Sequence, residues 1–316
     1  AERSEGLASC ASRAGTAYAA LARMMDSEPD GGVRWAEVFA HAVRLHVTPL
    51  SPAELFARQM DDHPRAWIFT SATLAVGEEF GHFTRELGLP QAAARRWASP
   101  FDFPQQALLY LPKGLPAEPN DPTFTDAVVD AALPVLRASG GRAFLLFTTL
   151  RALRRAHERL SRLGLPYPLL VQGTGSRSEL LARFRALGNA VLLGAQSFWE
   201  GVDVRGEALS VVVIDKLPFA PPDDPVLAAR IEAIRARGGN PFVELQLPQA
   251  VLSLKQGAGR LIRDESDRGV LMLCDPRLAS KAYGRQMLRS LPPMKPTRNL
   301  SEVEAFLGAH PQRGFG

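Results

Sequence analysis

The chain has 316 residues, of which 46% are hydrophobic, 22% charged and 8% aromatic, with a formal net charge of +4. This composition is typical of globular proteins and excludes the disordered, collagen-like and fibrous classes. No segment approaches the roughly 20 apolar residues that a membrane-spanning helix needs, and the length suggests about two domains.

The sequence contains two cysteines, Cys10 and Cys274. Two cysteines exclude a disulfide framework, a four-cysteine zinc site and an iron–sulfur cluster held by this chain alone. The N-terminal residues show no signal-peptide pattern, so we expect a reducing, cytoplasmic setting.

Basic residues are concentrated in two segments. Residues 142–185 contain nine arginines against two glutamates, and residues 277–316 contain seven basic against two acidic residues. Such segments suggest an anionic partner, either phosphate or nucleic acid. The preference for arginine over lysine would also follow from a GC-rich genome.

The first third of the chain predicts a mixture of short elements. Residues 1–35 read as the end of a helical segment closed by a turn, and six prolines within 99–122 indicate a linker with one short strand, 107–111. The elements between them are a helix over 53–60, a strand over 66–70 and a helix over 80–87.

From residue 143 onward, apolar runs alternate regularly with helical patterns. Continuous apolar strands of this kind predict a doubly wound α/β fold, in which a parallel sheet is covered by helices on both faces. Ligands of such folds lie at the carboxyl ends of the strands. The expected strands are 143–148, 169–172, 190–194, 210–215 and 269–274, and the expected helices are 150–163, 176–187, one ending at 236, and 247–263.

The helix expected over 247–263 has an unusual polar face. Gln256, Gly259, Arg260 and Arg263 follow the i, i+3, i+4, i+7 spacing that places side chains on one face. Glycine costs about 1 kcal/mol in a helix interior, so Gly257 and Gly259 suggest close approach of a ligand. Two arginines one turn apart can hold a polyphosphate.

Two loops at expected strand ends also carry candidate residues. In the loop 195–206, Glu200 and Asp203 flank Gly201, and Phe198 and Trp199 are either a plug over the core or part of a site. Ser71 and Thr73 follow the strand expected over 66–70. Their hydroxyls are either part of a site at the strand end or caps of the next helix.

Four segments occur in an order that resembles motifs III, IV, V and VI of superfamily-two helicases. Within that superfamily, the sequences FWEGVD and QGAGRLIR are similar to the corresponding motifs of the XPD/DinG branch and its YoaA/DinG group. The resemblance implies a RecA-like, P-loop NTPase-type fold and an iron–sulfur helicase that moves 5′ to 3′ on single-stranded DNA. The four segments are Ser71–Leu74 (SATL), Phe147–Thr149 (FTT), Ser197–Asp203 (SFWEGVD) and Gln256–Arg263 (QGAGRLIR).

The resemblance assigns the residues near the nucleotide. Arg260 and Arg263 would be arginine fingers that reach the γ-phosphate of ATP, with Gln256 beside them, since arginine stabilises charge on a transferring phosphoryl group. The remaining nucleotide-cleft residues would be Gly259, Glu200, Gly201 and Asp203.

The resemblance also assigns a DNA side. Ser71 and Thr73 would couple ATP hydrolysis to movement, and Thr148, Thr149 and Arg151 would lie along the DNA backbone. Trp199 would contact a base by stacking, with core packing as the alternative.

Several parts of the family pattern are absent from this sequence. There is no G-x-x-x-x-G-K-[ST] segment and no Asp-Glu-x-His, and the acidic stretch 264–267 reads as a solvated turn. The chain alone is therefore predicted to be inactive. The resemblance implies that ATP, Mg²⁺ and the iron–sulfur cluster are bound by an N-terminal half not present in this sequence.

The family pattern also predicts how the chain is divided. The expected parts are the end of an arch-like helical insertion (1–35), the returning part of the first RecA-like motor domain (36–98), a linker (99–122), the second RecA-like motor domain (123–291) and a basic C-terminal tail (292–316).

The function expected from these observations is that of the C-terminal portion of an ATP-dependent DNA helicase in DNA repair or replication. Its expected partners are single-stranded DNA, the N-terminal half and, through the C-terminal region, the chi subunit of the DNA polymerase III clamp loader. The alternative is a catalytically inert adaptor that binds DNA and a replication protein. A Rossmann-type metabolic enzyme is disfavoured, because no G-x-G-x-x-G follows an expected strand.

Overall fold

The computed structural model describes residues 4–25, 32–77, 79–195, 198–199 and 208–309. The chain divides into two compact units, each built from segments that are distant in sequence. Residues 220–246, which we expected within the second motor domain, belong to unit 1. Unit 1 comprises Ala1–Thr70, Phe80–Ala93 and Ala220–Gln246, and unit 2 comprises Ser71–Glu79, Ala94–Phe219 and Leu247–Gly316.

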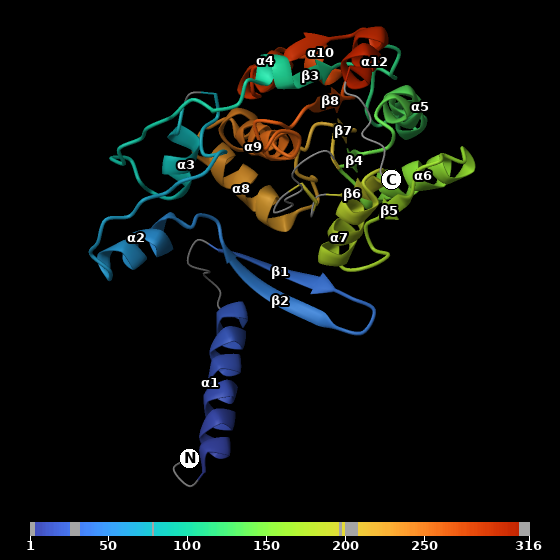
Figure 1. Ribbon diagram of the computed structural model, residues 1–316. Coiled ribbons are helices and arrows are strands. Elements are labelled where there is room, and N and C mark those ends of the chain that lie inside the picture. Colours follow the sequence, from blue (N-terminus) through green and yellow to red (C-terminus); the bar gives the residue numbers. More distant parts are fainter. Residues whose placement is uncertain (1–3, 26–31, 78, 196–197, 200–207, 310–316) are drawn as a thin grey trace. The chain divides into compact units, whose positions relative to one another are not determined.

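Unit 1 contains an antiparallel hairpin and several helices (Figure 1). In the hairpin Trp35 pairs with His46, and their rings stack with centroids 4.0 Å apart. The boundary expected at residue 35 falls inside the first strand and is therefore wrong at that point. The elements are α1 (Glu5–Met25), β1 (Gly32–Val38), β2 (Val43–Pro49), α2 (Ala53–Asp61), α3 (Gly81–Glu86), α8 (Pro225–Ala236) and a π-helical segment (Phe242–Gln246).

The strand expected over residues 66–70 does not form. Trp67 and Phe69 instead pack their rings against Phe56 of α2, and Phe69 also contacts Phe83 of α3, whereas Ile68 is 84% exposed. Half-buried and exposed residues do alternate here, but a strand also needs a neighbour for its backbone hydrogen bonds. No described strand pairs with this segment.

Unit 2 is built on a seven-stranded sheet in which every pairing is parallel (Figure 1). The expected strands are confirmed to within one or two residues at their ends. The seventh strand, β9, was not expected. In the order β5-β6-β4-β7-β8-β3-β9 the strands are Leu169–Val171, Val191–Gly194, Ala143–Leu146, Val211–Ile214, Gly269–Leu273, Ala107–Tyr110 and Lys295–Thr297.

Helices cover both faces of this sheet, which confirms the doubly wound α/β fold. Leu145 lies in one core cluster together with residues of α5, α6 and α12. Phe144 points to the opposite face, where its ring lies 4.6 Å from that of Phe184 on α7. Successive strand residues point to opposite faces, so the strands are apolar throughout. The helices are α4 (Phe103–Gln106), α5 (Phe124–Ala138), α6 (Leu150–Arg162), α7 (Arg177–Leu187), α9 (Leu247–Ala258), α10 (Arg277–Ser280), α11 (Ala282–Ser290) and α12 (Leu300–Gly308).

The expected C-terminal tail is folded over much of its length, so that expectation is corrected. Residues of β9 pair in parallel with β3, and α12 packs Val303 and Leu307 into the core. The strand β9 has only three residues, which is too short to show a hydrophobic period in the sequence. The prolines and basic residues around it suggested an unfolded tail.

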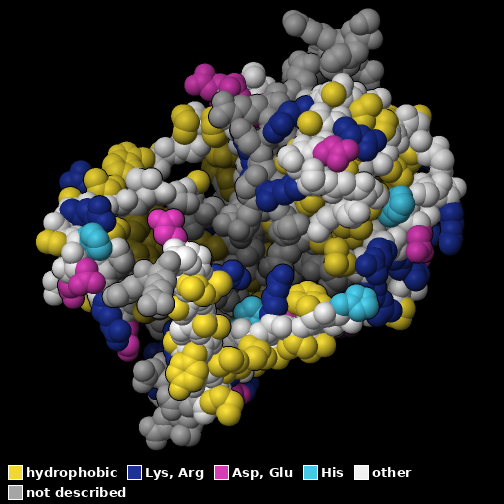
Figure 2. Space-filling view, turned by 90° about the horizontal axis from the view of Figure 1, so that it is seen from below, with side chains coloured by type: hydrophobic (Ala, Val, Ile, Leu, Met, Phe, Trp, Pro, Cys, Tyr) yellow, Lys and Arg dark blue, Asp and Glu magenta, His cyan; other side chains and the backbone are white. Residues whose placement is uncertain are grey.

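Hydrophobic side chains also lie at the surface, and Figure 2 shows several of them on one face of the molecule. In the hairpin of unit 1, Val38, Val43 and Leu45 are more than half exposed. No helix in the described ranges is long and apolar enough to cross a bilayer.

Removing the Leu307 side chain tests whether residues 300–308 belong to the folded core. We expect Leu307→Ala to lower the free energy of unfolding by about 2 kcal/mol, because it leaves a cavity between α12 and the sheet. Glu304→Ala, on the exposed side of the same helix, should change it by less than about 0.5 kcal/mol. Equal effects of the two variants in urea unfolding would mean that α12 is not packed on the core.

Candidate functional site

The helix that carries the arginines ends earlier than expected. The amide of Gly259 donates the last helical hydrogen bond, to the Lys255 carbonyl at 2.8 Å, and α9 stops at Ala258. Beyond that point Leu261 and Ile262 are both buried. Glycines weaken the helix there, and burial of the two apolar side chains turns the chain. Gln256, Gly259, Arg260 and Arg263 therefore do not share one helical face.

Trp199 is part of the core next to this helix. Its side chain is only 3% exposed, and its indole N–H lies 3.4 Å from the Phe147 carbonyl oxygen. A Cβ on Gly257 would lie 3.0 Å from the indole and 3.1 Å from Ile214. Gly257 therefore makes room for the indole rather than for a ligand, and a ring buried in this way presents no face to a base.

Arg260 joins the end of α9 to the same loop. Its guanidinium donates two hydrogen bonds to the Trp199 carbonyl oxygen, from Nε at 3.0 Å and from Nη2 at 2.7 Å. A two-donor contact with one carbonyl fixes the side chain against the backbone of the residue that precedes position 200. Glu200, Gly201 and Asp203, expected next to the nucleotide, lie outside the described residues.

The turn after α9 is held by a buried carboxylate. Asp267 is 6% exposed and accepts hydrogen bonds from the backbone amides of Arg263 and Asp264 at 2.8 and 2.9 Å. The side-chain amide of Gln106 donates hydrogen bonds from Nε2 to three backbone carbonyl oxygens of the same turn. The stretch 264–266 is the exposed turn that we expected, but Asp267 is buried and holds the backbone from which Arg263 extends.

The segment with Ser71 and Thr73 is held by α9 as well. Lys255 donates a hydrogen bond from Nζ to the Ala75 carbonyl oxygen at 2.8 Å. Within the segment the Thr73 amide donates to Ser71 Oγ at 3.1 Å. Burial, with a smaller effect of the Arg96 charge, lowers the pKa of Lys255. Sequence reasoning missed this lysine, whose position gives no sign of a partner 180 residues away.

The second group of expected residues lies after the carboxyl end of β4, beside the end of β7. The Thr148 amide donates a hydrogen bond to Asp215 Oδ1 at 2.9 Å, and Thr149 caps α6 by accepting one from the Ala152 amide at 3.1 Å. Arg151 is exposed on the first turn of α6. The structure thus places Thr148, Thr149 and Arg151 together at one edge of the sheet.

Asp215 is a feature of this edge that sequence reasoning missed. Its side chain is 1% exposed, and burial raises its pKa to about 7, although the amides of Thr148 and Lys216 donate to Oδ1. Oδ2 has no hydrogen-bond partner among the described residues. An acidic residue that directly follows an apolar strand was the signal available in the sequence.

Among the described residues, no group of three or more His, Cys, Asp and Glu side chains is arranged to hold a metal ion. Cys274 follows β8 and is buried, which raises the pKa of its thiol. Cys10 lies exposed on α1.

Residues 132–294, just over half of the chain, match the family described as "Helicase C-terminal domain". The chain belongs to this helicase C-terminal domain family.

The chain is similar over most of its length to named bacterial helicases. It is 46% identical to "ATP-dependent DNA helicase YoaA" of Escherichia coli over 287 residues, which cover 91% of this chain and 45% of that protein. It is 40% identical to "ATP-dependent helicase DinG" of Mycobacterium tuberculosis over 301 residues, 92% of this chain and 45% of that one. The chain thus spans about half the length of these relatives, and the resemblance to the YoaA/DinG group is confirmed.

A solved structure titled "XPD_Helicase" has the same fold. It aligns with a TM-score of 0.62 at 19% identity and covers 85% of this chain and 48% of that one. This likeness confirms the RecA-like fold expected from the four motifs.

The buried Asp215 carboxyl predicts a pH dependence of stability. Its pKa of about 7 in the folded chain is above the ordinary value of 3.8, so between these values the folded state holds a proton that the unfolded state has released. The contribution of this group to the free energy of unfolding is fully present below about pH 4 and is lost as the pH rises to about 7.

We therefore expect Asp215→Asn, which keeps the neutral form, to remove this dependence. Between pH 5 and pH 8 the original chain should lose about 2–3 kcal/mol of unfolding free energy relative to the variant. Urea unfolding at both pH values measures the difference. Parallel pH profiles of the two proteins would show that Asp215 is ionised throughout.

Proposed function

We propose that this chain is the C-terminal motor portion of an ATP-dependent helicase that moves 5′ to 3′ on single-stranded DNA in repair or replication. The observation that carries the proposal is that two other motif segments, those with Ser71 and with Trp199, meet the end of α9 and the residues that follow it. Lys255 binds the segment with Ser71 and Thr73, Gly257 receives the Trp199 indole, and Arg260 binds the Trp199 carbonyl. Such a connected group could transmit a change at the nucleotide to the loops that contact DNA.

The two arginines then have different roles. Arg260 already uses two guanidinium donors on a backbone carbonyl, so we assign it to positioning the loop after Trp199. Arg263, on a backbone fixed by Asp267, is the finger that stabilises charge on the transferred γ-phosphate. Gln256, Gly259, Glu200, Gly201 and Asp203 complete this side of the nucleotide cleft.

The DNA side is the carboxyl edge of the sheet. Thr148, Thr149 and Arg151 lie there, and the Arg151 guanidinium is exposed to meet a phosphate. Ser71 and Thr73 act between this edge and the nucleotide.

The parts that bind ATP and Mg²⁺ are assigned to an N-terminal half, because the chain has no Walker lysine and no Asp-Glu-x-His segment. The iron–sulfur cluster belongs there too, since two cysteines cannot hold one and Cys274 is buried. The chi subunit remains a proposed partner of the C-terminal region, where it would meet the folded surface of α12.

The test is ATP hydrolysis by this chain, with and without single-stranded DNA, alone and mixed with the remaining half of a YoaA-type protein expressed separately. We expect no turnover above background for the chain alone and DNA-stimulated turnover in the mixture. Turnover by the chain alone would contradict the assignment. Binding of DNA or chi without turnover in any mixture would favour the inert adaptor.

Variants in the mixture separate the two arginines. Arg263→Ala should lower kcat by about 10³-fold, since it removes a donor to the transferred phosphoryl group. Arg263→Lys should recover little of that rate, because a lysine is a point charge without the planar fork. Arg260→Ala should weaken the stimulation by DNA more than the basal rate, and the opposite ranking would exchange the two roles.

A further inference from the structure

The arginines of α6 fall into two sets. Arg155 and Arg159 are committed to α5, where they make short hydrogen bonds to the carboxylates of Asp126 and Asp130. On the side of α6 away from these pairs, Arg154 makes no ion pair or hydrogen bond with any described residue. An exposed guanidinium without an internal partner is available to a ligand.

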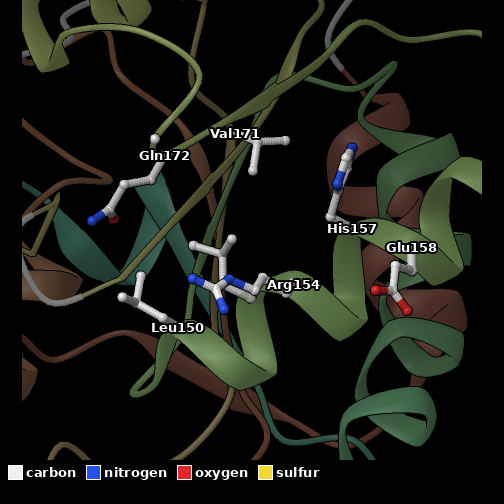
Figure 3. A pocket seen from close by; sticks show the side chains of 8 residues that line it. Leu150, Arg154, His157, Glu158, Val171 and Gln172 are labelled. Carbon is white, nitrogen blue, oxygen red and sulfur yellow. The ribbon is translucent and has the colours of Figure 1, made fainter. Parts of the chain in front are cut away.

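Arg154 borders a cavity of about 340 Å³ between α6 and the end of β5 (Figure 3). Leu150, Leu153 and Val171 supply apolar walls, of which Leu153 and Val171 are buried and Leu150 is 49% exposed. This volume is near the lower limit of small-ligand sites, so the cavity suits a single ring system rather than a large molecule.

The polar rim of this cavity, which we call the α6–β5 pocket, is formed by Arg154, His157, Glu158 and Gln172. In Figure 3 Arg154 and Val171 point into the same space, and His157 and Glu158 lie further along α6. The Glu158 charge also acts on Arg155, whose pKa it helps to raise. Gln172 lies at the opposite wall, with Oε1 accepting a hydrogen bond from the Ala195 amide at 2.6 Å.

The pocket opens beside the edge assigned to DNA. Leu150 directly follows Thr149, and Gln172 follows the carboxyl end of β5 in the same parallel sheet. A strand of nucleic acid that runs past Thr148, Thr149 and Arg151 would therefore present its bases within reach of this cavity.

We propose that the α6–β5 pocket receives one base of the bound single strand, and this inference rests on the proposed function. The base would lie against Leu150 and Val171, with the planar Arg154 guanidinium stacked on it or bound to its phosphate. Arginine planes serve as stacking surfaces for unpaired bases. A base has an apolar face and a polar edge with donors and acceptors, which matches apolar walls below a polar rim of Arg154, His157, Glu158 and Gln172. An apolar side chain of a protein partner would leave that rim unmatched.

The test compares two oligonucleotides of equal length, oligo-dT and an abasic strand with the same phosphates, by fluorescence anisotropy with this chain. We expect Leu150→Ala to weaken oligo-dT binding at least threefold and to leave the abasic strand unchanged. Arg154→Ala should weaken oligo-dT about tenfold and the abasic strand less.

Two matched controls are available on the same helix. Leu163→Ala removes a leucine of similar exposure just after the other end of α6, and Arg162→Ala removes the same charge away from the pocket. Neither should distinguish the two strands.

The outcomes separate this inference from the proposed function. Failure of the original chain to bind either strand would overturn both. Binding of both strands with equal losses in the pocket variants would leave the DNA function standing and reduce Arg154 to a phosphate contact, which overturns the base pocket. Binding that is unaffected by either pocket variant, together with loss of binding to a protein partner, would assign the cavity to that partner instead.

Discussion

Burial of parallel strands on both faces constrains everything else in unit 2. A parallel strand can follow another only after a crossover, so all carboxyl ends, and the loops that leave them, meet at one edge of the sheet. Thr148, Asp215 and Gln172 come from three such loops. Residues that are 24 positions apart or more, such as Thr148 and Gln172, thereby become parts of one surface, which is where doubly wound folds bind their ligands.

A second constraint is the close packing of Trp199 on α9. The indole needs the missing Cβ of Gly257, and its burial brings the Trp199 carbonyl within reach of the Arg260 guanidinium. A side chain at position 257 would displace the ring, and with it the Trp199 carbonyl to which Arg260 binds. Interiors are packed too densely to absorb such a change locally, so motifs that are separate in the sequence are mechanically joined here.

Burial of the Asp215 carboxyl lowers the stability of the fold when the group is ionised, and such a buried group points to a functional role. Two backbone amides bind one oxygen, while the other has no described partner, so the ionised form is poorly stabilised. Isolated buried charge is avoided in proteins unless something compensates for it, and strongly shifted groups gather at functional sites. Its place between Thr148 and Lys216 puts this titrating group beside the residues proposed to meet DNA.

The sequence by itself determined six of the seven strands of the unit 2 sheet, several helices and the family, because apolar periodicity and ordered motifs are local properties of the chain. It also selected Arg260 and Arg263, but it placed them on a helix that ends before either. Only the tertiary structure decided that Trp199 is buried, that residues 66–70 form no strand, that residues 295–308 join the fold and that Asp267 is shielded from water. Each of these depends on a partner distant in sequence, or on the lack of one, and periodicity along the chain carries no information about such partners.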